Sequence, residues 1–251
     1  MTHDALRVLT ALIGVALFAL GQVSFAQTAP PDPEDVAQRI AALTDEFRNQ
    51  EGRGNVAPSE PLMAAARYFA GYLAKSEQFS HGADGSSPIA RAQRRGYDSG
   101  CVWENIAQRY SSSVPSAAEL AMAFVEGWKK SPLHRQNMLE TEATGTGIAV
   151  APGKEGQYYA VQMFGLPGSQ VIEFTVVNRS ESNVNYVLGD RVYSLAPTDI
   201  RTHKQCQTEE LTFGFRRQEK KEVFRPRRGE RLRVMQEESG RFRVEVERER
   251  E

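Results

Sequence analysis

The chain has 251 residues, of which 40% are hydrophobic and 25% are charged, and its formal net charge is −1. This composition is typical of a globular protein and excludes a disordered chain. Two cysteines are too few for a disulfide-dense scaffold or for a structural zinc site made of thiolates. The near-neutral charge gives no reason to expect nucleic acid as a partner.

Residues 1–26 have the pattern of a secretory signal peptide. A basic residue precedes an apolar run over residues 8–20, and small residues at Ser24 and Ala26 mark a cleavage point after Ala26. The alternative is an uncleaved membrane anchor, but Gln22 and Ser24 interrupt the run, and a spanning helix needs about 20 mainly apolar residues. We therefore expect a secreted or periplasmic protein with no transmembrane span after processing.

Export gives the two cysteines, Cys101 and Cys206, a compartment in which disulfides persist. A bridge between them would close a loop of about 100 residues and contribute up to roughly 4.7 kcal/mol through chain entropy. It would also tie the two halves of the chain together. Two separate buried thiols are the alternative, and we favour the bridge.

Residues 33–166 are expected to form helices followed by a strand pair. Asp32 is the N-cap of a first helix that starts at Pro33, and Ser116 with Glu119 forms a capping box for a later one. Two further helices are expected to begin near Ser59 and Ser87, and residues 147–150 and 158–164 alternate as strands do. The expected domain is α+β, with helices layered on a small sheet.

From residue 170 onward, after a short linker over residues 165–168, apolar and polar residues alternate with a period of two. Two hairpins are expected, with turns at Gly189-Asp190 and at Ser239-Gly240. Residues 170–251 are therefore predicted to form a small all-β accessory module.

The part of the chain that follows the signal peptide contains three histidines, His81, His134 and His203. Between the first two, Glu104 places a carboxylate in an otherwise apolar stretch. Taken singly, each histidine is more often a hydrogen-bonded structural residue than a ligand. His203 also has a His-x-x-Cys spacing with Cys206, a weak metal signal because no second pair accompanies it.

The order of the motifs carries more information than their spacing. Ser80-His81, then Glu104-Asn105-Ile106, Gly127-Trp128, the segment 131–139 and the strand 158–165 follow one another along the chain. This order resembles that of the CAP superfamily (cysteine-rich secretory proteins, antigen 5 and pathogenesis-related proteins) in its bacterial SCP-like form. The resemblance covers about residues 35–165.

The resemblance implies an α-β-α sandwich with a cleft lined by two histidines and two acidic residues. His81 and His134 match the histidines, and Glu104 matches the acid of the Glu-Asn-Ile motif. The second acid of animal and plant members would fall near Ser131, where this chain has a serine. Members of the family bind small lipids, ions, glycans or partner proteins, so a ligand of one of these kinds is expected.

In the family the histidines are the usual metal ligands, so His81 and His134 are expected to hold Zn²⁺ or another divalent cation. The leading hypothesis is a non-enzymatic binding protein with this cleft. The alternative is a metal-dependent, peptidase-like hydrolase in which Glu104 is the candidate catalytic base. A serine nucleophile at Ser131 is set aside, because a serine before Pro132 is explained as a helix N-cap.

A third hypothesis places function in the accessory module. Residues 216–233 contain nine basic and three acidic residues. They could bind an anionic glycan or lipid of the cell envelope. Equally, they could form the solvated face of edge strands, on which basic residues deter aggregation.

Overall fold

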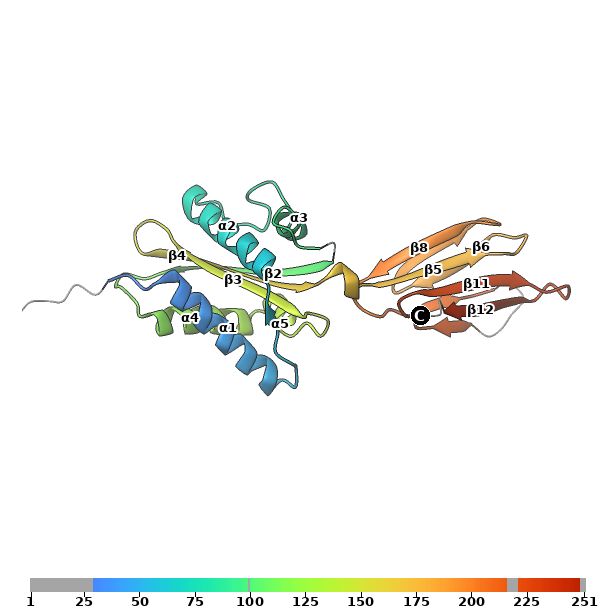
Figure 1. Ribbon diagram of the computed structural model, residues 1–251, viewed down its shortest axis with the longest axis horizontal. Helices are drawn as coiled ribbons and strands as arrows, with labels where there is room; N and C mark the ends of the chain where they lie inside the picture. Colours follow the sequence, from blue (N-terminus) through green and yellow to red (C-terminus); the bar gives the residue numbers. More distant parts are fainter. Residues whose placement is uncertain (1–28, 99, 216–220, 249–251) are drawn as a thin grey trace, which may run out of the picture.

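The computed structural model describes residues 29–98, 100–215 and 221–248. The predicted signal peptide, residues 1–26, lies outside this part of the chain. Within it, no helix is long and apolar enough to cross a membrane. Figure 1 shows an elongated molecule, with a mixed helical and sheet part joined to an all-strand part.

The first part is an α-β-α sandwich, as predicted. Its sheet has the strand order β1-β3-β4-β2, and helices cover both faces of it (Figure 1). The helices are α1 (Pro33–Gln50), α2 (Glu60–Ser76), α3 (Pro88–Gln93), α4 (Ala117–Lys130) and α5 (Pro132–Met138), and the strands are β1 (Ala57–Pro58), β2 (Cys101–Tyr110), β3 (Gly145–Pro152) and β4 (Gln157–Leu166).

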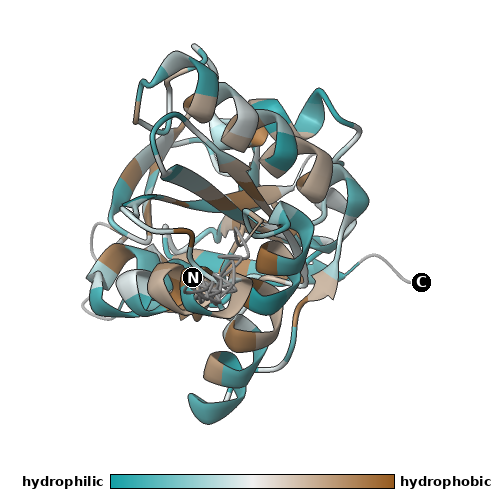
Figure 2. Ribbon diagram, turned by 90° about the vertical axis from the view of Figure 1, so that its left-hand side faces the viewer, coloured by the Kyte–Doolittle hydropathy of each residue, from teal (hydrophilic) through white to brown (hydrophobic). Residues whose placement is uncertain are grey.

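Each face of the sheet has its own apolar core. Phe124 and Trp128 of α4 pack with Ile40 of α1 on one face, whereas Phe69 and Leu73 of α2 pack on the other. The hydropathy colouring in Figure 2 shows apolar segments on the helices around the sheet. The helical spacing that predicted these elements thus marks the faces that are buried.

The predicted helix starts are confirmed by their caps. The Asp32 carboxylate accepts a hydrogen bond from the backbone N–H of Glu34 at 3.0 Å. Ser116 and Glu119 form the reciprocal capping box of α4. Local side-chain chemistry therefore fixes where these helices begin.

The sheet contains a long strand that the sequence analysis did not anticipate. Strand β2 pairs antiparallel with β4 along its whole length, from Cys101 opposite Leu166 to Tyr110 opposite Gln157. Its three successive residues 104–106 are all buried, so the alternation of a half-exposed strand is missing. A strand covered on both faces loses that signal.

The second part is all β, as predicted. After a short 3₁₀ turn (Gly168–Gln170), two four-stranded sheets form, with orders β12-β11-β5-β8 and β10-β9-β6-β7. Phe174 and Val234 of one sheet pack against Tyr186 and Phe213 of the other. The strands are β5 (Ile172–Asn178), β6 (Val184–Leu188), β7 (Arg191–Leu195), β8 (Ile200–Gln205), β9 (Leu211–Phe213), β10 (Glu222–Phe224), β11 (Glu230–Gln236) and β12 (Phe242–Arg248).

Both predicted hairpins are present. Leu188 of β6 pairs with Arg191 of β7 across the Gly189-Asp190 turn, and Gln236 of β11 pairs with Phe242 of β12. Gly189 and Gly240 have φ angles of 58° and 78°. These left-handed conformations explain the glycines in both turns.

A disulfide between Cys101 and Cys206 joins the two parts, with a Cα–Cα distance of 6.0 Å. The predicted bridge is therefore confirmed, and the alternative of two separate thiols is wrong. Beside it, Gln207 Nε2 donates to both carboxylate oxygens of the buried Glu140 at 2.8 Å. One covalent bond and one polar contact thus fix the module against the sandwich.

We expect the double substitution Cys101→Ser/Cys206→Ser to lower the free energy of unfolding by about 2–5 kcal/mol, because the unfolded chain regains the freedom of a long loop. Urea denaturation followed by circular dichroism measures this change. Adding reductant should destabilise the natural protein by a similar amount and leave the double variant unchanged. Equal stability of the variant and the natural protein would contradict the expectation.

Candidate functional site

A fully buried arginine on the short helix α3 organises the predicted site. Arg91 Nη2 donates to both carboxylate oxygens of Glu104 at 2.8 Å, and Nη1 donates to Asp84 Oδ1 at 2.8 Å. The side chains of all three residues are at most 1% exposed. A charge without water needs such partners, because desolvation would otherwise cost several kcal/mol.

The same guanidinium holds the loop that precedes α3. It donates to the backbone carbonyls of Ser86 at 2.8 Å and of His81 at 2.9 Å. Its other contact is the ring of Phe69 on α2, with Arg91 Cζ 3.5 Å from the ring centroid. Arg91 therefore holds the backbone of His81 in place.

The imidazole of His81 is fixed by Glu104. His81 Nδ1 lies 2.8 Å from Glu104 Oε1, while 52% of the His81 side chain is exposed. A carboxylate oxygen accepts, so Nδ1 carries the hydrogen, and Nε2 of the neutral ring keeps a free lone pair. The arrangement presents an oriented imidazole at the protein surface.

The buried cluster carries an excess of negative charge, because one guanidinium faces the carboxylates of Asp84 and Glu104. Burial raises the pKa of Asp84, but hydrogen bonds from Ser86 and Arg91 outweigh burial, and the pKa is lowered. Asp84 is thus held in its charged form.

The second predicted histidine, His134, lies on α5 and is anchored to the neighbouring residue of β2. Asn105 Nδ2 donates to the His134 carbonyl at 3.1 Å, and Asn137 Nδ2 donates to Asn105 Oδ1 at 3.0 Å. Burial, and then the charge of His81, lower the pKa of His134. The two imidazoles are therefore electrostatic neighbours, and His134 favours its neutral form.

Ser131 occupies the junction between α4 and α5. It is the C-cap of the first helix and the N-cap of the second, and its carbonyl accepts from the backbone N–H of Arg135 at 2.8 Å. Ser131 thus has the predicted N-cap position, but its side chain makes no capping hydrogen bond to α5.

The geometry limits what kind of metal site these residues could form. Both oxygens of Glu104 already accept from Arg91, and one of them also contacts His81. Within residues 29–98, 100–215 and 221–248, no group of three or more His, Cys, Asp or Glu side chains could hold a metal ion. The described residues therefore offer no three-ligand protein cage, and Glu104 is not free to complete one.

Sequence reasoning missed the roles of Arg91 and Asp84. Arg91 lies 13 residues from Glu104 in the chain, and the order of the motifs does not show that the two side chains pair. The one available signal is Phe69, which lies on the buried face of the predicted second helix and supplies the ring beneath the guanidinium.

The weak metal signal at His203 and Cys206 is wrong. Cys206 is oxidised in the disulfide, and His203 Nε2 lies 2.8 Å from the hydroxyl of Tyr186. The His203 ring also packs on Phe174 and Tyr193, with centroid distances of 5.1 and 4.8 Å. Its pKa is lowered by burial and then by Arg201. His203 is a core residue of the accessory module.

The basic residues of the accessory module lie among acidic partners. Arg225 pairs with Glu210 at 2.8 Å, and Arg233 pairs with Glu247 at 2.6 Å across two strands. Three members of the basic segment, Arg216, Arg217 and Lys220, lie outside the described residues. The described part has the mixed charges of a solvated face.

Residues 41–164 match the model of the cysteine-rich secretory protein (CAP) family. The chain is a CAP-domain protein. The match covers both histidines, Glu104 and Arg91, so the site lies entirely within the CAP domain. The chain matches no curated protein sequence.

Three solved bacterial structures are similar to the chain, and each similarity covers 53% of it. An outer surface protein of Borrelia burgdorferi is 18% identical, with a TM-score of 0.45 and 93% of that chain covered. An extracellular SCP-domain protein of Bacillus anthracis is 25% identical (TM-score 0.42, 41% covered). A cysteine-rich secretory protein of Staphylococcus aureus is 16% identical (TM-score 0.41, 39% covered). The chain thus spans about two-fifths of the second and third structures.

Replacing Arg91 should be strongly destabilising. We expect Arg91→Met to cost about 3–5 kcal/mol, because two buried carboxylates lose the guanidinium that they share. The double variant Arg91→Met/Glu104→Gln should regain part of this loss, since one charge is removed. Urea denaturation of both variants measures the difference. A loss below about 1 kcal/mol in Arg91→Met would show that the cluster is not a structural centre.

The lowered pKa of His134 predicts acid sensitivity of the CAP domain. The unfolded state binds the proton more readily, so stability is complete above the ordinary pKa of 6.5 and falls as the pH drops through the lowered folded value. His203 has a lowered pKa as well and contributes in the same direction.

Titration of histidine resonances by NMR should therefore place the midpoint of His134 below 6.5. The His134→Gln variant should lose less stability than the natural protein when the pH is lowered from about 7.5 to about 5.5. A midpoint above the ordinary value, or an identical loss in the variant, would contradict the prediction.

Proposed function

We propose that the CAP domain is an exported, non-enzymatic binding module. His81 and His134 hold a divalent cation in a cleft that also includes Glu104 and Ser131. The hydrogen bond of 2.8 Å between His81 Nδ1 and Glu104 Oε1 carries the proposal. A small lipid, glycan or protein ligand then binds at this surface.

The carboxylate–imidazole pair supports cation binding rather than simple packing. Metal-binding histidines usually donate their second ring nitrogen to a carboxylate, which fixes the tautomer and makes the ligand nitrogen more basic. Glu104 accepts such a hydrogen bond from His81, and Arg91 donates to Glu104 and holds it in place. With half of its side chain exposed, His81 remains accessible to an incoming ion.

The charges around the site also support cation binding. The buried cluster behind His81 has an excess negative charge, which attracts a cation. His134, with its lowered pKa, is neutral at pH 7 and can offer a lone pair. Zn²⁺ fits imidazole ligands, and the cation would supply a fixed positive charge for an anionic or carbonyl group of the ligand.

The position of Glu104 favours binding over hydrolysis. A general base needs an oxygen within hydrogen-bond reach of the water that it deprotonates. The Glu104 side chain is 1% exposed, and both of its oxygens are engaged by Arg91. The metal-dependent hydrolase therefore remains the second candidate.

Zn²⁺ titration of the mature protein by isothermal titration calorimetry tests the proposal. We expect His81→Ala and His134→Ala each to abolish measurable binding, since two protein ligands are the minimum set. Glu104→Gln should weaken binding by about 10–100-fold, the usual effect of removing a partner behind a metal-bound histidine. Binding should also weaken below pH about 6.5, where imidazoles become protonated.

Gln136→Ala is the matched control, because Gln136 is an exposed residue on the same helix as His134. It should bind Zn²⁺ as the natural protein does. Equal binding by the natural protein and the variant His81→Ala/His134→Ala would refute the two-histidine site. Turnover of an ester, peptide or glycan substrate that is lost in Glu104→Gln would favour the hydrolase instead.

A further inference from the structure

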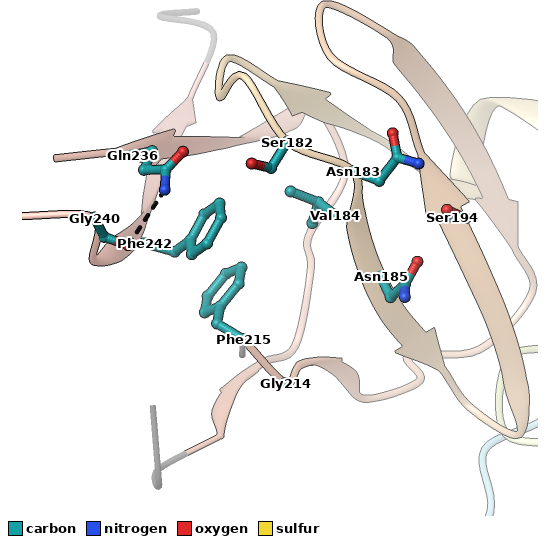
Figure 3. Close-up of a pocket in the computed structure, with 10 residues that line it drawn as sticks. All are labelled: Ser182, Asn183, Val184, Asn185, Ser194, Gly214, Phe215, Gln236, Gly240 and Phe242. Atoms are coloured by element: carbon teal, nitrogen blue, oxygen red, sulfur yellow. Dashed lines mark hydrogen bonds between the residues drawn. The ribbon is translucent and has the colours of Figure 1, made fainter. Parts of the chain in front are cut away.

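The accessory module contains a cavity of about 710 Å³, well away from the CAP-domain site. This volume lies within the range of about 300–1,000 Å³ that is typical of small-molecule sites. Ten of the described residues line it, and none of these ten is charged. They are Ser182, Asn183, Val184, Asn185, Ser194, Gly214, Phe215, Gln236, Gly240 and Phe242 (Figure 3).

The cavity lies at the end of the module that is remote from the CAP domain. Strand β5 follows the linker, and β11 runs parallel to it, with Val234 opposite Asn178. Gln236, at the end of β11, therefore lies at the far end, as the turn between β11 and β12 does in Figure 1. A ligand could reach this end without approaching the CAP domain.

We propose that this cavity binds an uncharged oligosaccharide. A pyranose ring combines a rim of hydroxyl groups, which donate and accept, with apolar C–H faces and no charge. The described lining offers the matching features, namely neutral polar side chains and an aromatic wall.

The polar part of the cavity consists of amides and hydroxyls that are available to a ligand. Asn183, Asn185 and Ser194 are exposed, and their side chains make no hydrogen bond with any other described residue. Asn185 and Ser194 lie opposite each other on β6 and β7. Amide and hydroxyl groups can each donate and accept, as recognition of sugar hydroxyls requires.

The aromatic wall is formed by Phe215, which follows β9, and Phe242 of β12. The two rings stack with their centroids 4.8 Å apart and their planes within 8° of each other. Figure 3 shows both rings beside Gln236, with Val184 of β6 pointing toward them. Gln236 Nε2 donates to the Gly240 carbonyl at 3.3 Å, so its orientation is fixed while Oε1 can still accept.

An extended peptide is the competing ligand for this site. Peptides that bind to sheets add as a strand and use unpaired main-chain groups. Strand β6, which carries Asn185, is already paired on both sides, with β7 and with β9, whereas β7 and β12 are the edge strands of their sheets. Recognition by β6 must therefore rely on side chains, and a short peptide is the control for the two edges.

Gly214 offers a way to close the cavity without disturbing the fold. A Cβ atom built on Gly214 meets no other atom within 4 Å, and its φ angle is not in the left-handed region. A large side chain at this position therefore extends into the cavity, whereas Gly214→Ala leaves it open.

Isothermal titration calorimetry of the mature protein with cellotetraose, maltotetraose and chitotetraose tests the proposal. We expect at least one tetrasaccharide to bind, and its affinity to be unchanged at an ionic strength of about 1 M, because the lining residues in the described part of the chain are all uncharged. Gly214→Trp should abolish binding, and Asn183→Ala/Asn185→Ala should weaken it about tenfold or more, through the loss of two hydrogen bonds.

Three control variants should keep the affinity of the natural protein. They are Gly214→Ala, the triple variant Arg225→Glu/Arg227→Glu/Arg228→Glu and the double variant His81→Ala/His134→Ala. Melting temperatures confirm that each variant is folded, and the exposed asparagine pair provides a test that does not depend on Gly214→Trp. The proposal is wrong if no tetrasaccharide binds, if binding survives both cavity variants, or if N-acetyl-tetraalanine amide binds in place of the sugars. Loss of affinity in the arginine variant would assign binding to the basic segment instead.

Discussion

The contact between Arg91 and Glu104 is the constraint on which the CAP domain depends. A guanidinium with no exposure to water must find carboxylates, and here it draws together β2, α3 and the loop that carries His81. The ring of Phe69 covers it from α2. The surface imidazole is therefore positioned by an ion pair that is almost completely shielded from solvent.

Both histidines depend on neighbouring residues of one edge strand. Glu104 bonds to the His81 ring, and Asn105 bonds to the backbone of His134. Successive residues of a strand point to opposite faces, so the two partners come from helical layers on opposite sides of the sheet. Strand β2 is the last strand of the sheet order, so residues of both layers have access to its free edge. Asn105 is held in turn by Gln162 of β4 at 3.1 Å.

How much of this could be predicted from sequence depends on how local the determining contacts are. The capping box of Ser116 and Glu119 acts within one helical turn, and the glycine turn at Gly189 acts within one hairpin, so both were predicted correctly. Strand β2 was missed because helices on both faces remove its alternation.

The site likewise has residues that the sequence could predict and contacts that it could not. Motif order suggested His81, Glu104 and His134, but it could not show that Arg91 occupies both oxygens of Glu104. That fact decides whether the carboxylate can act as a base or only as a support. The cavity in the accessory module was not foreseen, because its asparagines, serines and phenylalanines come from five separate strands or turns and share no motif.

The parallel pairing of β5 with β11 has a consequence for the order in which the chain folds. The last strand of the CAP domain, β4, ends at Leu166, so that domain can fold without any strand of the accessory module. Strand β5, in contrast, needs β11, more than 50 residues later, before its second edge is covered. Domains generally fold as units. A folded CAP domain presents Cys101 in its final place, so in an oxidising compartment the bridge to Cys206 can act as an early tether for the assembly of that sheet.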